Sequence, residues 1–452
     1  MITDHEAVVW TRIGMRPVKM GRVYITDREC RFTYTEDYAE NGLPGLGLIY
    51  PPKIVQTTTI VRQRTEFFDL LPPLQALVPP RREKNFQRTL ILAHLAKRGI
   101  LPAAGFEADW EILKIAGHGG MGHLDLFEND EKAAEWYSAP ARQELREVTR
   151  DFGLSLKDFL TWFDTDPESI LEIVGPTPTV GGAIPKLLVS IADDGWDGRL
   201  GLPRRIGAKG MTDALLKFEQ AGTYPGITEL EALTLDIHTE AGFEVPRHWR
   251  TEINGIPTLV IERFDRDVAG IPRFMETLHS IFACGDLSIT HHYSGSYDAI
   301  GRAIDRSPIP LVEDGRAAKE HLLKRLLLSF ATGNGDLHLE NLSILDREGT
   351  LAFSPVYDPT PMRAYAIHDM LAAMPFGAYG EVRFEEALLR LTRNLGFRKK
   401  DLLHAIEVVL TVTRSYPERI EGLSALPGKN KKNLVGIVEK IRKDLTKIRK
   451  SI

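Results

Sequence analysis

The sequence predicts an α+β fold with two lobes, of which the second is mostly helical. Strand-like alternation and turn signals run from Val8 to about Leu126. Helical patterns dominate beyond residue 268, interrupted by one predicted β-hairpin within Gly333–Asp358. These patterns divide the chain into an N-terminal α/β subdomain (1–130), a lobe with strands and a glycine-rich loop (131–268) and a helical lobe (269–452).

The composition is that of a globular protein and excludes several other classes. The 452 residues carry a net charge of −5, which argues against a general nucleic-acid coat. The two cysteines, Cys30 and Cys284, fit neither a disulfide framework nor a metal-binding spacing, as expected in a reducing cytosol. No signal peptide and no apolar run of membrane-spanning length is visible, so we expect a cytoplasmic protein without a membrane partner.

One glycine-rich segment of the N-terminal subdomain matches a dinucleotide fingerprint but lacks the required context. Gly117–Gly122 has the pattern G-x-G-x-x-G, which needs a strand before it and a helix directly after it. The following residues, His123–Phe127, alternate like a strand instead. We therefore expect a tight glycine turn here, and a helix earlier in the subdomain at Glu83–Arg98.

The middle lobe begins with charged helical patterns and continues into a glycine- and proline-rich loop. Helices are predicted at Ala133–Tyr137 and Ala141–Phe152. The loop Gly175–Lys186 contains adjacent glycines, whose backbone N–H groups can surround a phosphate. Because Gly/Pro-rich loops are common, the elements that follow this loop decide what it indicates.

Two short strands follow the loop, and the second of them carries a lysine. The strands are predicted at Leu187–Ile191 and Ala214–Phe218, and the lysine is Lys217. An inward lysine on a strand after a glycine loop can bind phosphates. The simpler interpretation is an exposed strand lysine.

A helix and a further strand complete the middle lobe. The helix is predicted with Thr228 as its N-cap, and it places Glu231 where an ion pair with Lys217 can form. The strand Leu259–Ile261 leads directly into Glu262–Arg266, ERFDR. In a two-lobed nucleotide-binding enzyme this is the place of a hinge whose backbone faces adenine.

The most informative stretch is Gly333–Asp358, which follows a predicted helix at Ala317–Phe330. Short strands are predicted at Leu342–Leu345 and Thr350–Val356, with a turn between them. A hairpin folded at this turn brings the residues before its first strand close to those after its second strand.

Three polar residues flank the predicted hairpin in a pattern that suits phosphoryl transfer. Asn341 and Asp358 come to the same side, within reach of one cation, and Asp336 lies on the loop that enters the hairpin. A loop aspartate can accept a proton from a hydroxyl, while asparagine and aspartate oxygens can hold Mg²⁺ against phosphates. The alternative is a surface loop in which these residues only form turns.

The helical lobe offers one further feature, a basic C-terminal segment. Gly428–Ile452 contains nine Lys/Arg and two Asp/Glu, so 9 − 2 gives a charge of +7. It is interpreted as a capping helix with a solvated basic face, or alternatively as a surface for DNA. Its apolar stripe consists of Leu434, Ile437, Ile441, Leu445 and Ile448. The histidines His279, His291 and His292 lack the spacing of a metal site.

The order of these motifs resembles the HipA-type serine/threonine kinases, the toxins of bacterial toxin–antitoxin modules. The likeness covers nearly the whole chain and is carried by the glycine loop, the strand lysine, ERFDR at Glu262–Arg266, GNGDLHLEN at Gly333–Asn341 and PVYD at Pro355–Asp358. The resemblance implies a two-lobed, protein-kinase-like (HipA-like) fold, ATP and Mg²⁺ as cofactors, and a protein substrate.

The resemblance also implies a role for each matching residue. Asp336 would be the catalytic base, and His338 would support the catalytic loop. Asn341 and Asp358 would hold Mg²⁺. ATP would be bound by Gly181, Gly182, Ala183, Lys186, Lys217 and the backbone of Glu262, Arg263 and Phe264.

Some family features differ in this chain. HipA kinases autophosphorylate a serine just ahead of the glycine loop, whereas this chain has Thr179 there and Thr177 nearby, both candidates for autophosphorylation. Glu340 stands where the family has a basic residue, and Ile184 and Pro185 replace polar residues of the loop. These changes bear on loop mobility and substrate choice more than on phosphoryl transfer.

The family resemblance suggests a partner, and two other functions stay open. No segment reads as a helix-turn-helix, so DNA would be reached through a separate HipB-like antitoxin or through the basic C-terminal helix. Gly335–Asn341 is also the signature of small-molecule kinases of the aminoglycoside and choline kinase type. The non-enzymatic alternative is a nucleotide-binding pseudokinase that acts as a corepressor.

Overall fold

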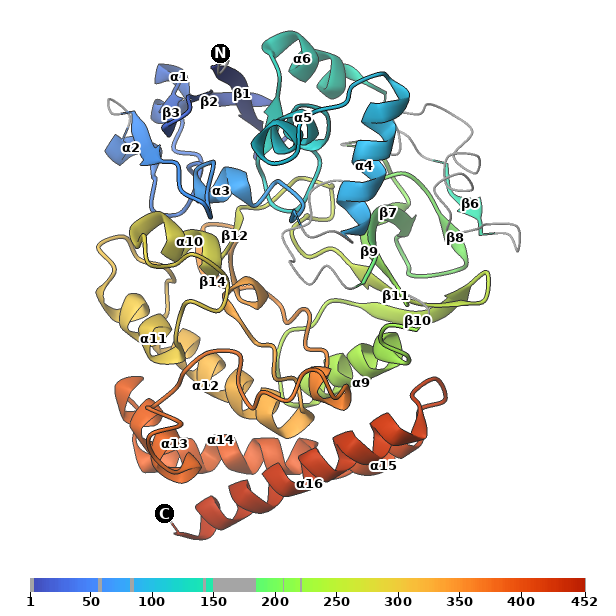
Figure 1. Ribbon diagram of the computed structural model, residues 1–452, viewed down its shortest axis with the longest axis vertical. Coiled ribbons are helices and arrows are strands. Elements are labelled where there is room, and N and C mark those ends of the chain that lie inside the picture. Colours follow the sequence, from blue (N-terminus) through green and yellow to red (C-terminus); the bar gives the residue numbers. More distant parts are fainter. Residues whose placement is uncertain are drawn as a thin grey trace. The chain divides into compact units, whose positions relative to one another are not determined.

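The computed structural model describes residues 4–55, 59–81, 85–140, 144–148, 184–205, 207–219 and 222–451. They form two compact units, whose elements are labelled in Figure 1. Unit 1 comprises Met1–Phe218 and Thr251–Thr290, and unit 2 comprises Glu219–Arg250 and His291–Ile452. The three-part division expected from the sequence stays a prediction. Within the described ranges, no helix is both long enough and apolar enough to cross a membrane.

The first layer of unit 1 is an antiparallel five-stranded sheet in the order β4-β3-β2-β1-β5. Its strands are β1 (His5–Thr11), β2 (Val18–Ile25), β3 (Glu29–Tyr34), β4 (Ile60–Gln63) and β5 (Asp125–Phe127). Buried and exposed side chains alternate along β3, as the sequence predicts for a half-buried strand. The helices of this part are α1 (Glu36–Glu40), α2 (Pro52–Val55), α3 (Pro72–Gln75), α4 (Phe86–Lys97), α5 (Phe106–Ala116) and α6 (Asp130–Ser138).

The glycine segment after α5 is a turn, as predicted. It follows a helix and leads into the strand β5, the reverse of the order that a dinucleotide site needs. Gly119 and Gly122 have φ angles of 71° and 76°, in the left-handed region where a Cβ is disfavoured.

One helix prediction in the middle of the chain is wrong. Ala141–Phe152 reads as helical, but β6 (Arg146–Glu147) lies within it and pairs antiparallel with β8 (Arg199–Leu200). The alternation of charged and apolar residues is equally compatible with a short strand, and a two-residue pairing leaves no periodic signal.

The second sheet has the strand order β10-β11-β9-β7. Its strands are β7 (Lys186–Ala192), β9 (Met211–Phe218), β10 (His248–Ile253) and β11 (Ile256–Glu262). The three predicted strands of this region are confirmed, whereas β10 was not predicted. Every residue of β7 is buried, so its sequence reads as a continuous run rather than an alternation. Unit 1 ends with β12 (Met275–Thr277) and α10 (Leu278–Gly285).

Unit 2 is mainly helical. Its helices are α9 (Ile227–Glu240), α11 (Tyr297–Arg306), α12 (Gly315–Thr332), α13 (Phe384–Asn394), α14 (Lys399–Val412), α15 (Tyr416–Glu421) and α16 (Gly428–Ser451). The prediction of Thr228 as the N-cap of α9 is wrong, because Gly226, with φ 76°, occupies that position. The hydroxyl of Thr228 instead contacts Glu219 at 3.4 Å.

The basic C-terminal helix packs on the core of unit 2. In Figure 1, α14 and α16 run side by side, and both contact α12. The buried stripe consists of Leu434, Val438, Ile441, Leu445 and Ile448, so Val438 takes the place predicted for Ile437. The lysines Lys429, Lys432, Lys440, Lys443, Lys447 and Lys450 are exposed. A docked helix with a solvated basic face is therefore present.

Candidate active site

The predicted hairpin is present in unit 2. Strands β13 (Ser343–Arg347) and β14 (Thr350–Phe353) pair antiparallel in the register Ile344↔Phe353 to Arg347↔Thr350. The turn between them places Glu348 and Gly349 at φ 54° and 90°, and Gly349 donates its N–H to the Asp346 carboxylate at 2.7 Å. A left-handed pair of residues suits a two-residue hairpin turn.

A tyrosine fastens the two ends of the hairpin together. The Tyr357 hydroxyl donates to the carbonyl of Glu340 at 2.5 Å and lies 2.6 Å from the Ser343 hydroxyl. Glu340 directly precedes Asn341, and Tyr357 directly precedes Asp358. The two candidate cation ligands are therefore attached to backbone segments that touch each other.

The donor set at this place fits Mg²⁺. The side-chain N–H of Asn341 donates to the carbonyl of Asp336 at 2.9 Å, which leaves the amide oxygen as the atom offered to a cation. Asp358 adds a carboxylate and has φ 47°, in the left-handed region. Two protein oxygens completed by phosphate oxygens and water are typical of Mg²⁺. In the described part of the chain, no group of three or more His, Cys, Asp and Glu residues forms a separate metal cluster.

The loop that carries Asp336 is held from several directions. The N–H of Asp336 donates to Asn334 at 2.7 Å, and its carboxylate accepts a hydrogen bond from the Tyr293 hydroxyl at 2.7 Å. His338 lies 3.9 Å from the second carboxylate oxygen and accepts the N–H of Glu340 at 3.2 Å, which caps the short turn η1 (Leu339–Asn341). His338 thus contacts both Asp336 and the turn that follows it, and its role as the support of the loop stays a prediction.

A buried arginine reaches the backbone next to Asp358. Arg325 of α12 donates to the carbonyl of Tyr357 at 3.2 Å and also contacts the ring nitrogen Nε2 of His238. Burial lowers the pKa of Arg325 to about 9, an effect that the nearby Tyr357 and Asp358 oppose. Burial and the neighbouring arginine hold the pKa of His238 well below its usual value, so the imidazole is a neutral acceptor.

Unit 1 contains the two candidate phosphate-binding lysines. Lys186 of β7 and Lys217 of β9 are register partners in an antiparallel pair, so their side chains leave the sheet on the same face. They are only 4% and 2% exposed. The alternative of an exposed strand lysine at Lys217 is therefore wrong.

The ERFDR segment connects β11 to the glycine turn of the N-terminal subdomain. Arg263 donates to the Asp265 carboxylate at 2.8 Å and to the Gly120 carbonyl at 2.7 Å, and Arg266 donates to the Gly122 carbonyl at 2.7 Å. Burial alone would raise the pKa of Asp265, but the guanidinium groups of Arg263 and Arg266 lower it to about 2.

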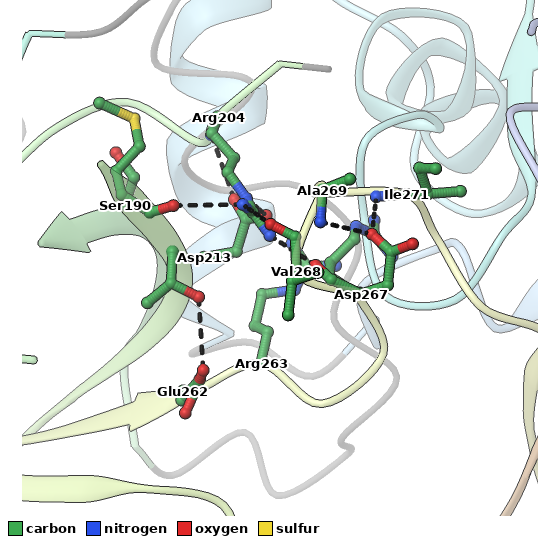
Figure 2. Close-up of polar contacts among 12 residues, drawn as sticks. Ser190, Arg204, Asp213, Glu262, Arg263, Asp267, Val268, Ala269 and Ile271 are labelled. Carbon is green, nitrogen blue, oxygen red and sulfur yellow. Dashed lines mark hydrogen bonds and ion pairs between the residues drawn. The ribbon is translucent and has the colours of Figure 1, made fainter. Parts of the chain in front are cut away.

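A second arginine–aspartate pair extends this polar network. Figure 2 shows Arg204 directed at Asp213 and at the carbonyls of Asp267 and Val268, with hydrogen bonds of 2.9, 2.7 and 2.9 Å. The backbone N–H of Arg263 donates to the carbonyl of Asp213 at 2.9 Å. Because this N–H pairs with β9, it does not remain available to adenine in the predicted adenine-binding segment.

Several predicted site residues lie outside the described ranges. These are Gly181, Gly182 and Ala183 of the glycine loop and the candidate phosphorylation sites Thr177 and Thr179. The ion pair of Lys217 with Glu231 would join residues of two units, so it stays a prediction. Within unit 2, Glu231 accepts a hydrogen bond from Thr360 at 3.1 Å.

Two residues of the site were missed in the sequence. Tyr293 and Arg325 bond to the catalytic loop and to the end of the hairpin, yet neither belongs to a recognisable motif. Tyr293 lies 43 positions before its partner Asp336. Tyr357 belongs to the PVYD motif, but its contacts with Glu340 and Ser343 were not predicted.

A loop aspartate beside paired asparagine and aspartate ligands is the arrangement of phosphoryl-transfer enzymes, and comparison with known proteins agrees. Residues 179–416 match the family model described as HipA-like C-terminal domain. The chain is 24% identical over 276 residues to a Haemophilus influenzae protein named "Putative kinase", covering 55% of this chain and 76% of that protein. It is 30% identical over 168 residues to "Putative kinase Y4dM" of Sinorhizobium fredii, covering 34% of this chain and 38% of that one.

A solved structure shares the fold over the full length. The match is to the Shewanella oneidensis toxin–antitoxin system HipA, HipB and operator DNA complex, with a TM-score of 0.63 and 16% identity, covering 100% of this chain and 99% of that chain. The match to the family model of the HipA-like C-terminal domain spans more than half of the chain and therefore shows the family. This protein belongs to the HipA-like kinase family.

Proposed function

We propose that the protein is an ATP-dependent serine/threonine kinase that phosphorylates another protein. The observation that carries this proposal is the hairpin whose ends are joined by Tyr357, because the two joined segments carry Asn341 and Asp358, and Asn341 bonds to the backbone of Asp336. Family membership supports kinase chemistry, and the competent residue types at all three positions argue against a pseudokinase.

Each residue has a distinct task in the proposed reaction. Asp336 orients the acceptor hydroxyl and accepts its proton. Asn341 and Asp358 would hold Mg²⁺, which when bound neutralises charge on the phosphate oxygens. No covalent enzyme intermediate is needed, since catalysis rests on orientation and charge.

The buried lysines of unit 1 supply positive charge for the phosphates of ATP. Lys186 and Lys217 stand opposite each other on neighbouring strands, and both side chains are buried on one face of the sheet, where they would bind phosphate oxygens. The backbone of Glu262 and Phe264 would contact adenine. The N–H of Arg263 is bonded to Asp213, so it is not part of that contact.

The protein partner would be a DNA-binding antitoxin. The similar Shewanella chain is described in a complex with HipB and operator DNA, and no part of this chain reads as a helix-turn-helix. The exposed lysines of α16 provide a basic surface that could contact DNA held by such a partner.

The first test is phosphate transfer by the purified protein. Wild type and Asp336→Gln are incubated with Mg-ATP, and phosphopeptides are mapped by mass spectrometry. We expect phosphate on Thr179 or Thr177 in the wild type only, because removal of the base stops transfer while the ATP-binding residues stay in place.

ATP binding is measured alongside phosphate transfer for both proteins. A variant Asp336→Gln with unchanged turnover would refute the assignment of the base. Wild-type protein that binds Mg-ATP but transfers no phosphate to itself, to casein or to ribosomal extracts would favour the pseudokinase instead.

A further inference from the structure

The candidate base is contacted by a tyrosine that belongs to a different segment of unit 2. The Tyr293 hydroxyl donates a hydrogen bond of 2.7 Å to the carboxylate oxygen Oδ1 of Asp336. The ring of Tyr293 also lies edge-on to His338, with ring centroids 5.1 Å apart and an interplanar angle of 85°. Tyr293 therefore touches both predicted functional residues of the D-x-H loop.

The turn that carries Tyr293 is attached to the catalytic loop at several points. The N–H of Leu339 donates to the carbonyl of His292 at 3.1 Å. The buried Tyr297 hydroxyl donates to the carbonyl of Leu337 at 2.6 Å, and Gly295 packs so closely on Leu339 that a Cβ would lie 2.9 Å from its side chain. These contacts fix the turn, which argues against a Tyr293 side chain that swings in and out.

The turn also has internal hydrogen bonds. The N–H of Tyr293 donates to the ring nitrogen Nδ1 of His291 at 3.2 Å, and the N–H of Ser294 donates to the carbonyl of His291 at 2.9 Å. The Tyr293 ring is packed against the ring of His292 at 4.2 Å. These contacts within the turn hold the Tyr293 ring in place beside Asp336.

We propose that Tyr293 is a positioning residue for phosphoryl transfer, and this inference rests on the proposed kinase function. By donating to Oδ1, the hydroxyl holds the carboxylate of Asp336 in one orientation, in which it can receive the acceptor hydroxyl. Tyr293 itself does not touch the reacting atoms.

The Tyr293→Phe variant isolates this hydroxyl, because the ring and its packing remain. We expect kcat to fall by about tenfold or more, since loss of orientation affects the transition state, while KM for ATP stays unchanged. Tyr379→Phe serves as the matched control, because Tyr379 is 44% exposed and belongs to the same unit.

Direct observation of the carboxylate separates this inference from the proposed function. In protein labelled with ¹³C at aspartate carboxylates, the Asp336 signal is assigned with Asp336→Asn and compared at one pH in wild type, Tyr293→Phe and Tyr379→Phe. A carboxyl chemical shift that changes in Tyr293→Phe and not in Tyr379→Phe supports the contact.

An Asp336 carboxyl chemical shift equal to that of the wild type, a higher KM for ATP in place of a lower kcat, or a kcat equal to or above that of the wild type would overturn the positioning role. A higher kcat would show instead that the hydroxyl competes with the substrate. A changed Asp336 signal in a protein without any phosphate transfer would retain the contact and refute the kinase proposal.

Discussion

A single buried carboxyl group makes the stability of this protein depend on pH. Glu276 lies inside unit 1, where its carboxylate accepts hydrogen bonds from the N–H of Leu48 and the hydroxyl of Ser280, each at 2.6 Å. Burial raises the pKa of Glu276 to about 7, against an ordinary value of 4.5. Burial outweighs these two hydrogen bonds, so the charged form of the Glu276 carboxylate is the costly one.

We predict that Glu276 makes the folded protein less stable as pH rises from about 5 to about 7. In that window the folded state retains a proton that the unfolded chain has lost, so the free energy of unfolding decreases with pH. The change amounts to roughly 3 kcal/mol over the window. Urea unfolding of wild type and Glu276→Gln at several pH values measures it. A wild type whose pH dependence equals that of the glutamine variant would contradict the prediction.

Among the elements of unit 1, the ERFDR segment at Glu262–Arg266 connects β11 to the glycine turn after α5 by hydrogen bonds. One carboxylate, Asp265, stands between two buried guanidinium groups, and it also accepts the N–H of Gly122 at 2.8 Å. The network thus supports the fold of unit 1, and its Arg263 also lies within the predicted adenine segment.

We predict that Asp265→Asn destabilises unit 1 by about 3 kcal/mol or more, because two buried arginines lose their counter-charge. Denaturant unfolding followed by tryptophan fluorescence measures the loss. Asp194→Asn is the control, since Asp194 is exposed in a turn and its loss should change stability by less than about 0.5 kcal/mol. A similar midpoint for both variants would contradict the role assigned to Asp265.

Elements with long periodic patterns could be predicted from the sequence, whereas those set by distant partners could not. The helices α12 and α16 and the hairpin at β13 and β14 were predicted within a few residues, because their apolar spacing and turn residues are local signals. Strand β10 consists of the six residues His-Trp-Arg-Thr-Glu-Ile, which include charged side chains and form a strand by pairing with a neighbour.

The residues of the candidate site likewise comprise some that a local motif predicts and some that only tertiary contacts bring in. Motif spacing indicated Asp336, Asn341 and Asp358, but Tyr293 and Arg325 bond to the site through tertiary contacts without a local pattern. The prediction of an ordinary N-cap at Thr228 failed because a glycine in a left-handed conformation was available two residues earlier.

At the scale of the whole molecule, ATP binding should stabilise the folded chain. Mg-ATP at about 100 times its dissociation constant adds roughly 2.7 kcal/mol by mass action. We predict a higher melting temperature with Mg-ATP for wild type and Asp336→Gln alike. Addition of EDTA should lower it again, and Asp358→Asn should lose the Mg²⁺-dependent part. Differential scanning fluorimetry provides the measurement, and a shift that is insensitive to EDTA would contradict the Mg²⁺ assignment.

The way the chain is divided between its units determines the order in which they can fold on the ribosome. Unit 1 is complete once Thr290 has left the ribosome, although its segments are separated by residues 219–250. Those residues, including α9, must wait until the remainder of unit 2 has been synthesised through α16. During translation the apolar face of α9 therefore remains without its partners for the time needed to add about 200 residues, a period in which chaperone binding is expected.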